Sequence, residues 1–506
     1  MLGKHDPNVE LLDAQAHCRT LVPRGSVYAF LADHRKQLFP DEMFEDLFPT
    51  GRGRPSVPGE VIACAMLLKE LEGLSDRQAA DALRCDIRWK VATGLALDDP
   101  GIHYSVFTYW RTRLNRSDQP DRIKDALRRV VDETGVLKGR KRRALDSTLL
   151  DDAVATQDTV TQLVSAIRKI RKLVPETAAV EVTAHNYDTS GKPVCAWDDP
   201  VAKQQLVSGL VGDALRILAT LGDTKLTTEQ QDAKGLLALV AGQDVEPGEQ
   251  EGSWRIARGV APDRTISTVD PESRHMHKSR SVYRDGFKAH LAVEPQTGII
   301  TECSLTAANA ADGANGVDLL KGEEPGLTIL ADSAYGSGQV RSDLEKLQHT
   351  QLIKPLPLSM AVPGGFTRDD FQVDHKAKTV TCPAEHTVNI NSTGRASFQK
   401  HCRGCPLIDR CTRSSRGRVL TIGENDEQLV NARKQWKDPL AVAEYNKYRP
   451  MVERSISWLV TDNHRRVRYR GIDNNFAALN IRVAALNLRR LVNLGLDYQG
   501  AWILPA

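Results

Sequence analysis

The sequence predicts an α/β protein built on a mixed β-sheet, with an N-terminal helical domain, a helical insertion and a small Cys-rich insertion. Three strand patterns support this prediction: residues 143–150, a β-hairpin over residues 285–307 that turns at Pro-Gln-Thr-Gly, and residues 327–331. The last run is apolar except for Thr328, which is typical of a central strand covered on both faces. Helix patterns at 314–320 and 336–347 and a strand pattern at 351–357 complete the mixed sheet.

Residues before the first strand are predicted to be helical. Residues 61–71 are apolar over a broad face, Ser75 and Gln78 have the spacing of a capping box, and a third helix is expected from Ser105. Short helices with short connections suit a helix-turn-helix unit that binds DNA. A helical dimerisation or packing module is the alternative. If the unit binds DNA, its candidate contacts are Arg111 and Arg113 on the third helix.

Shifts in composition divide the chain into four predicted units. The helical domain spans 1–130, the sheet domain 139–154 with 264–361 and 437–506, the helical insertion 155–263, and the Cys-rich insertion 362–436. The helical insertion has apolar residues at helical spacing over 158–173 and 201–242.

Composition is that of a soluble globular protein. The 506 residues include 68 Lys and Arg against 65 Asp and Glu, and 41% are hydrophobic. The longest apolar run, 61–68, is too short to span a bilayer, and the first residues lack a secretory pattern, so we expect a cytoplasmic protein without membrane partners. The near-balanced charge excludes a surface that is positively charged all over, as in histones, but it does not exclude local basic patches. Neither a P-loop motif nor HExxH is present.

Three acidic residues are candidates for catalysis. Asp146 lies within a predicted strand, Asp332 follows the most apolar strand, and Glu453 lies on the shoulder of a helical stripe formed by Val452, Ile456, Leu459 and Val460. Asp151 and Asp152 are expected to be solvated residues beyond the strand end. Three carboxylates together supply the oxygen ligands that Mg²⁺ requires, with positions left for phosphate oxygens and water.

The blocks around these residues resemble the three catalytic blocks of DDE transposases: LDST at Asp146, ADSAYG at Asp332 and YRPMVERSISWL at Glu453. More narrowly, the chain resembles bacterial insertion-sequence transposases whose last acidic residue lies in a Tyr–Arg–Glu–Lys helix. The resemblance extends to GRGRPSVPGEV, GLSDRQAADAL and DIRWKVATGL near the N-terminus and to SRSVYRDGFKAHLAV and GIITECSLTAANAADG in the centre.

The last block departs from the family pattern at two positions. Arg449 fits the family arginine four residues before the Glu. Asn446 stands where the family has Tyr, with Tyr445 and Tyr448 on either side, and Val460 stands where it has Lys. The resemblance therefore supports a role for the arginine and leaves the Tyr and Lys roles open.

The resemblance implies a ribonuclease-H-like sheet on which Asp146, Asp332 and Glu453 hold two Mg²⁺ ions that Mn²⁺ can replace. It implies cleavage of double-stranded DNA at the element's terminal repeats, strand transfer to target DNA, and a homodimer on that DNA. Arg449 would contact a phosphate oxygen. The setting would be a bacterial cytoplasm, in association with the nucleoid. Two alternatives stay open: a nuclease of the same fold without strand transfer, and an inactive transposase-derived DNA-binding protein.

A second set of candidate ligands is rich in cysteine. The set comprises Cys382, Cys402, Cys405 and Cys411, and His386 or His401 could replace one thiol. Four such ligands fit a structural Zn²⁺ ion. Redox or packing thiols are the alternative.

Three basic patches are dense enough to bind phosphates: 138–143, 167–172 and 464–470. The last patch supplies Arg465, Arg466 and Arg468 as candidate DNA contacts. Tyr469, Trp458 and Tyr335 lie near the acidic blocks and could stack on an unpaired base, although burial in the core is the simpler expectation.

Overall fold

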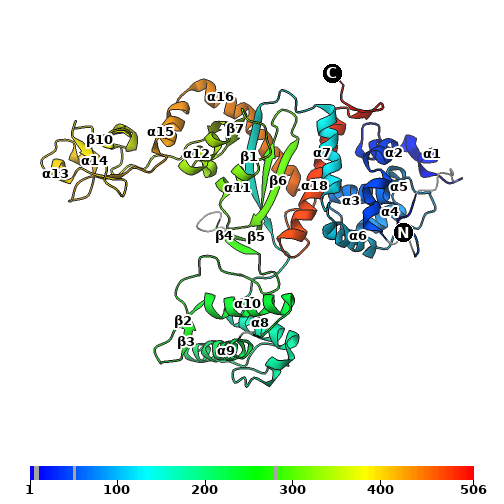
Figure 1. The fold of residues 1–506 in the computed structure, drawn as a ribbon, viewed down its shortest axis with the longest axis horizontal. Coiled ribbons are helices and arrows are strands. Elements are labelled where there is room, and N and C mark those ends of the chain that lie inside the picture. Colours follow the sequence, from blue (N-terminus) through cyan, green and yellow to red (C-terminus); the bar gives the residue numbers. More distant parts are fainter. Residues whose placement is uncertain (5–10, 50–52, 223, 278–282, 506) are drawn as a thin grey trace.

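The computed structural model describes residues 1–4, 11–49, 53–222, 224–277 and 283–505 (Figure 1). It confirms the predicted fold class, because a mixed sheet forms the centre of the chain and a helical region precedes it. Residues 51–52 and 279–282, which belong to two of the blocks quoted for the resemblance, lie outside the described residues. No helix of the described chain is long and apolar enough to cross a membrane.

The central sheet has six strands: β1 (Arg142–Asp151), β4 (Arg274–His277), β5 (Tyr283–Val293), β6 (Ile300–Ala307), β7 (Thr328–Ala331) and β8 (Thr350–Ile353). The order is β4-β5-β1-β7-β8, and β6 pairs with β5. β1 is antiparallel to β5 and parallel to β7, and β7 is parallel to β8. β8 ends earlier than predicted, before Pro355 and Pro357, which cannot donate to a strand ladder.

Helices cover both faces of this sheet. One face packs against α17 (Pro450–Val460) and α18 (Ile472–Asn493), and its core includes Leu150, Leu291 and Leu459. The other face packs against α11 (Asp312–Asp318) and α12 (Gly338–Lys346), around Leu145 and Ile329. Successive residues of β1 point to opposite faces, so Asp146 lies on the α17 side and Ser147 on the α11 side.

The N-terminal domain is helical, with helices α1 (Ala14–Cys18), α2 (Val27–Leu38), α3 (Gly59–Glu72), α4 (Asp76–Cys85), α5 (Ile87–Thr93), α6 (Ser105–Arg116) and α7 (Arg122–Thr134), and 3₁₀ turns η1 (Arg19–Leu21) and η2 (Asp41–Leu47). The predicted capping box of Ser75 and Gln78 starts α4, and the third predicted helix starts at Ser105.

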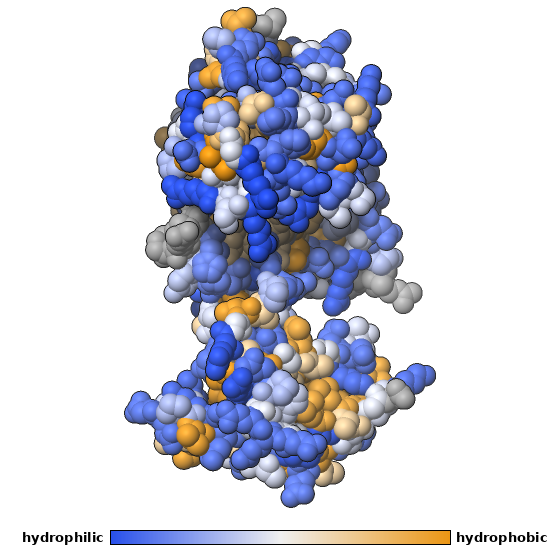
Figure 2. All heavy atoms as spheres, turned by 90° about the vertical axis from the view of Figure 1, so that its left-hand side faces the viewer, coloured by the Kyte–Doolittle hydropathy of each residue, from blue (hydrophilic) through white to orange (hydrophobic). Residues whose placement is uncertain are grey.

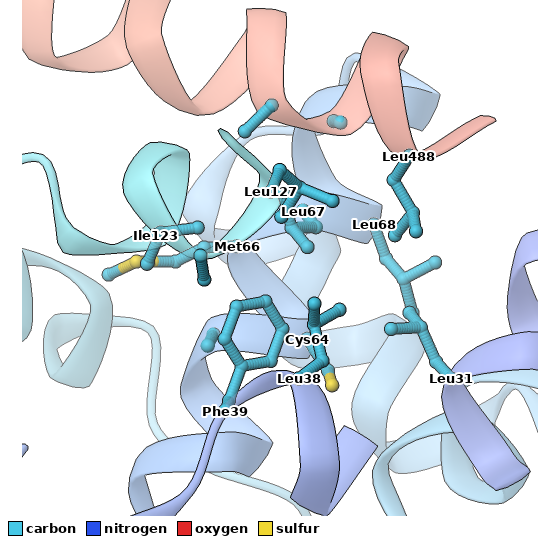
Figure 3. Close-up of a cluster of buried hydrophobic side chains, with 14 of the residues drawn as sticks. Leu31, Leu38, Phe39, Cys64, Met66, Leu67, Leu68, Ile123, Leu127 and Leu488 are labelled. Carbon is cyan, nitrogen blue, oxygen red and sulfur yellow. The ribbon is translucent and has the colours of Figure 1, made fainter. Parts of the chain in front are cut away.

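This domain shares its core with α18, a helix that our sequence analysis does not place. Leu31, Leu67 and Leu127 lie in one cluster with Leu488 of α18 (Figure 3). The C-terminal hairpin β14 (Asp497–Tyr498) and β15 (Trp502–Ile503) adds Trp502 to the same cluster. The helical domain and the sheet domain are therefore joined through α18 by a continuous apolar contact.

The helical insertion is a separate body with its own core, formed by α8 (Thr159–Leu173), η3 (Pro175–Ala179), α9 (Pro200–Leu221), α10 (Thr228–Gln243), β2 (Val245–Pro247) and β3 (Trp254–Ile256). Figure 2 shows it below the remainder of the molecule, with hydrophobic side chains exposed on one flank. Its buried Asp213 accepts hydrogen bonds from Tyr187 and from the backbone amides of Thr183 and Ala184, which fixes the loop before α9.

The Cys-rich insertion lies at the far end of the molecule from the N-terminal domain (Figure 1). It contains η5 (Arg368–Asp370), β9 (Gln372–Asp374), β10 (Thr379–Thr381), β11 (Thr387–Asn389), β12 (Arg395–Ser397), α13 (Gln399–Cys402), α14 (Ile408–Cys411) and β13 (Val419–Thr421). α15 (Asp426–Gln435) and α16 (Pro439–Tyr448) return the chain to the sheet, where α17 begins.

Candidate active site

Asp146 and Asp332 lie on adjacent strands of the central sheet. β1 and β7 are parallel, with Ala144 opposite Leu330, and each aspartate follows two residues later on its strand. Asp332 comes directly after β7, where its carboxylate accepts the Ala334 amide at 2.9 Å and starts the 3₁₀ turn η4 (Ser333–Tyr335). The carboxyl ends of parallel strands are where α/β sheets place ligands. The register therefore brings the two carboxylates to one edge of one face.

Arg449 lies at the junction of α16 and α17 and contacts two of the three acids. Its Nη2 is 2.8 Å from Asp146 Oδ2, and its Nη1 is 3.6 Å from Glu453 Oε1. The side chain is buried, and among the described residues its Nε and Nη1 have no hydrogen-bond partner. Arg449 thus offsets part of the negative charge of the acidic site and keeps unused donors for a further acceptor.

Glu453 occupies the first turn of α17 and is the exposed member of the trio, with 66% of its side chain accessible. The buried residues of α17 are Val452, Ser455 and Leu459, so the apolar stripe runs through Ser455 rather than through Ile456 and Val460, which are half-buried. Glu453 lies next to this stripe.

Burial and charge act against each other at Asp146 and Arg449. Burial raises the pKa of Asp146, and the neighbouring guanidinium of Arg449 offsets only part of that rise. Burial alone lowers the pKa of Arg449, but attraction to Asp146 and the hydrogen bond that Arg449 donates to its carboxylate raise that pKa above its ordinary value. Arg449 therefore stays charged, and its positive charge favours the ionised form of Asp146 against the effect of burial.

Family models for transposases match two parts of the chain. A transposase DDE domain matches residues 254–488, which contain Asp332, Arg449 and Glu453. A transposase domain (DUF772) matches residues 17–113. The chain belongs to the DDE transposases. Its DDE domain is that of a polynucleotidyl transferase, and the substrates of this family are DNA. Neither matched range contains Asp146, so its link to the site comes from the pairing of β1 with β7.

The other two comparisons give no relative to set beside this transposase. No curated protein matches the chain, and no solved structure does.

DDE domains generally depend on divalent metal ions, and the donor chemistry of this site fits that requirement. Asp146, Asp332 and Glu453 offer carboxylate oxygens around a buried, compensating arginine. Among the residues that the structure describes, no three His, Cys, Asp or Glu side chains are already close enough to enclose an ion. Since Glu453 is exposed, its rotation towards the aspartates would complete the donor set.

The structure distinguishes between the two tyrosines near Arg449. Tyr445 lies within electrostatic range of Asp146, Asp332, Glu453 and Arg449; burial raises its pKa, and the three acids raise it further while Arg449 lowers it. The ring of Tyr448 instead lies 4.3 Å from the Arg142 guanidinium. Tyr445 is therefore the tyrosine at the site, one turn of helix before Arg449.

Sequence reasoning missed a polar cluster on the α11 side of the sheet, directly behind the aspartates. Asp312 accepts the Ser147 hydroxyl at 2.8 Å and lies 3.1 Å from Lys288 Nζ. The Ser147 amide in turn donates to Asp146 Oδ1 at 2.8 Å. His290 and Tyr335 are buried beside Asp312. The alternation of polar residues in β5 opposite β1, Lys288 and His290, is the signal that could have revealed this cluster.

The five arginines predicted to contact DNA all bind acceptors within the chain. Because these contacts explain their positions without DNA, their role as DNA contacts stays a prediction. Arg111 donates to Asp76, Arg113 to the Leu47 carbonyl, Arg465 to Thr148 and the Leu149 carbonyl, Arg466 to the Asp152 carbonyl, and Arg468 to the carbonyls of Gly73 and Leu74.

Several other residues named from the sequence also lie in packed surroundings. Asp151 ends β1 and pairs with Arg284, but Asp152 is buried and accepts the Ser273 hydroxyl at 2.7 Å, so the expectation of a solvated Asp152 is wrong. Tyr335 is buried. Trp458 and Tyr469 are half-buried and lie under the guanidinium groups of Arg490 and Arg111, respectively.

The four cysteines of the Cys-rich insertion surround one cavity of about 20 Å³. Cys402 is buried, and its Sγ accepts the Arg418 amide at 3.4 Å. The thiols of Cys382, Cys402 and Cys405 lie within electrostatic range of Cys411, whose pKa is raised by burial and by these neighbours. His386 and His401 stack on each other at the same cavity, with ring centroids 4.7 Å apart. The sequence set is thus gathered in space, although in the described chain it does not enclose a metal position.

Proposed function

We propose that this transposase binds the ends of its own insertion sequence and catalyses metal-dependent DNA cleavage and strand transfer at Asp146, Asp332 and Glu453. The observation that supports this most strongly is the adjacency of Asp146 and Asp332 on one face of the sheet, with Arg449 bridging Asp146 to Glu453. Such an arrangement suits phosphodiester chemistry, in which negative charge must be stabilised on entering and leaving oxygens.

Each residue has a defined part in this proposal. The three carboxylates would hold Mg²⁺, or Mn²⁺ in its place, and the ions would supply Lewis-acid activation of the attacking oxygen. Arg449 orients Asp146 through its Nη2 and offers its remaining donors to a non-bridging phosphate oxygen. Glu453 approaches the aspartates by rotation from its exposed position. Asp332 is held in place by its hydrogen bond to the η4 turn.

The reaction uses water first and the freed DNA end second. Water attacks the phosphodiester at the element end, which breaks the P–O bond and releases a 3′-OH. That hydroxyl then attacks a target phosphodiester, so that one P–O bond forms as another breaks and no external energy source is needed. Pairing two element ends in this way requires a homodimer on DNA, acting on the nucleoid of a bacterial cytoplasm.

A product assay separates this proposal from its two rivals. Purified protein is incubated with Mg²⁺, a linear DNA carrying the element's ends, and a supercoiled target plasmid. Transposition gives joined products; a nuclease gives cut ends alone, and an inactive DNA-binding protein gives bound but intact DNA. Cut ends without joining, or no cutting, would overturn the proposal.

The cysteines support a second, structural metal. Four thiols at one small cavity, in a module of three-residue strands, suit one Zn²⁺ ion whose binding energy contributes to folding. Metal analysis of protein purified without chelator tests this directly. About one Zn²⁺ per chain is the expected result for a Cys₄ site, and absence of zinc would leave redox or packing thiols.

A further inference from the structure

A cleft of about 730 Å³ lies between the N-terminal helical domain and the sheet domain. α6, the start of α7 and the first turns of α18 form its walls, and Figure 1 shows α6 beside the N-terminal end of α18. This cleft is distinct from the acidic site, since none of Asp146, Asp332, Arg449 or Glu453 lines it.

The cationic side chains along the cleft fall into two groups, and the acidic Asp121 beside them accepts a hydrogen bond from the Asn480 amide. Arg111 and Lys124 are neutralised by Asp76 and Glu302. Arg116 and Arg470 are exposed, and neither guanidinium has a partner among the described residues. A guanidinium without an internal acceptor is available to an external anion, and its planar fork fits phosphate oxygens.

Neutral donors and small side chains complete the cleft. Asn115 at the end of α6 faces Asn474 of α18, with Nδ2 and Oδ1 3.4 Å apart. Both amides are exposed in the cleft. Ala477 and Ala478 line the α18 wall, so that a bound chain can approach the helix closely. Asparagine amides and arginines are common donors to the DNA backbone.

α18 connects this cleft rigidly to the helix that carries Glu453. Arg482 of α18 is buried and donates to the carbonyls of Trp458 and Leu459 on α17, and to the Glu70 carbonyl on α3. A ligand held between α6 and α18 is therefore fixed relative to the acidic site, as is needed if one DNA molecule contacts both.

We propose that this cleft binds the phosphodiester backbone of duplex DNA, with Arg116 and Arg470 as its two free phosphate contacts. The inference rests on the proposed function and adds to it a surface for the part of the DNA outside the active site. Contacts of this kind position DNA without reading its sequence.

Fluorescence anisotropy with the full-length protein and a labelled, random-sequence DNA duplex tests the proposal. The variants are Arg116→Glu and Arg470→Glu, and Arg129→Glu is the matched control, since Arg129 is exposed on α7, outside the cleft, and undergoes the same change in charge. Each cleft variant should raise the Kd for the duplex about tenfold. The plot of log K against log salt, which falls as salt rises, should become shallower by about one. The control should change far less, and all three variants should keep the wild-type melting temperature.

The outcomes separate this inference from the proposed function. If the two cleft variants bind the duplex as tightly as Arg129→Glu does, the cleft is not a DNA surface. The proposed function would stand in that case, provided that the wild-type protein binds the duplex. A wild-type protein that binds neither this duplex nor one carrying element ends would contradict the proposed function itself.

Discussion

The catalytic sheet and the Cys-rich insertion both gather candidate metal ligands, but they hold them by different means. In the sheet, Asp146 and Asp332 are fixed by strand register, and the buried Arg449 compensates their charge. In the insertion, the strands have three residues each, and the cluster has only a few buried hydrophobic residues, among them Phe371 and Phe398. A core of that size rarely stabilises a fold alone.

Under the proposed function, this difference predicts that Mg²⁺ acts in catalysis and that Zn²⁺ acts in folding. Strand register and the buried Arg449 hold the two aspartates in place, so removing Mg²⁺ should stop the reaction and leave the fold unchanged. The thiol site has little other support, so removing Zn²⁺ should unfold the insertion. The four predictions that follow test this contrast, from the largest expected effect to the smallest.

The largest effect is expected for Asp146→Asn. The amide keeps the shape of the side chain but loses the charge that a divalent ion and Arg449 require, so strand transfer should fall by about three orders of magnitude or more. Asp151→Asn is the matched control, because Asp151 lies on the same strand and pairs with Arg284 away from the site. An Asp146→Asn enzyme with activity similar to the control would assign Asp146 to structure only.

The Cys402→Ser/Cys405→Ser double variant should lose its bound zinc and expose the insertion to protease. The physical reason is that the free energy of zinc binding is part of the free energy of folding of such a module. Limited proteolysis with mass spectrometry should then find cleavage within residues 366–422. Cys85→Ser, at an exposed thiol of the N-terminal domain, should behave as wild type. Loss of zinc with an intact, protease-resistant insertion would break the contrast between the two regions.

Arg449→Lys should reduce strand transfer about tenfold to a hundredfold, since lysine keeps the charge but loses the fork that contacts Asp146 and a phosphate together. Activity at saturating DNA should fall more than DNA affinity, because the contact is made at the reacting phosphate. Unchanged activity with weakened binding would instead place Arg449 among the general phosphate contacts.

The smallest effect concerns stability against acid in the polar cluster behind the site. Burial lowers the pKa of His290 to about 4 from its ordinary value of 6.5, so the folded protein keeps this imidazole neutral. As pH falls below 6.5, His290 takes up a proton in the unfolded chain before it does so in the folded protein. The free energy of unfolding therefore decreases by up to about 3 kcal/mol by about pH 4.

His290→Gln, which keeps a group able to hydrogen-bond Thr306, should therefore lose less stability between about pH 7 and about pH 4.5 than wild type does. Thermal melts at the two pH values provide the measurement. An equal loss in both proteins would show that His290 does not titrate on unfolding.

Much of the fold could be predicted because local signals decide it. The apolar run of β7, the Ser75 capping box and the hairpin of β5 and β6 depend on neighbouring residues and match the structure. α18 went unplaced, although its apolar residues recur at helical spacing over Ile472–Asn493.

Which arginines bind acceptors within the chain could not be predicted, since those acceptors are distant in sequence. Arg468 looks like its neighbours in a basic patch, yet it donates to the carbonyls of Gly73 and Leu74 in the N-terminal domain. Arg116 and Arg470 lack such acceptors among the described residues, and no local pattern distinguishes them. The density of basic residues in 464–470 therefore does not show which of its arginines are bound within the chain.

Strand transfer by Glu453→Gln in Mg²⁺ tests the central claim most directly. The Glu453 side chain is 66% exposed, and among the described residues its ion-pair contact is with the Arg449 guanidinium at 3.6 Å, so its amide should leave folding and DNA affinity near wild type. If three carboxylates act as one metal site, strand transfer should nevertheless fall by about three orders of magnitude. Near-normal strand transfer by folded Glu453→Gln protein would contradict the account.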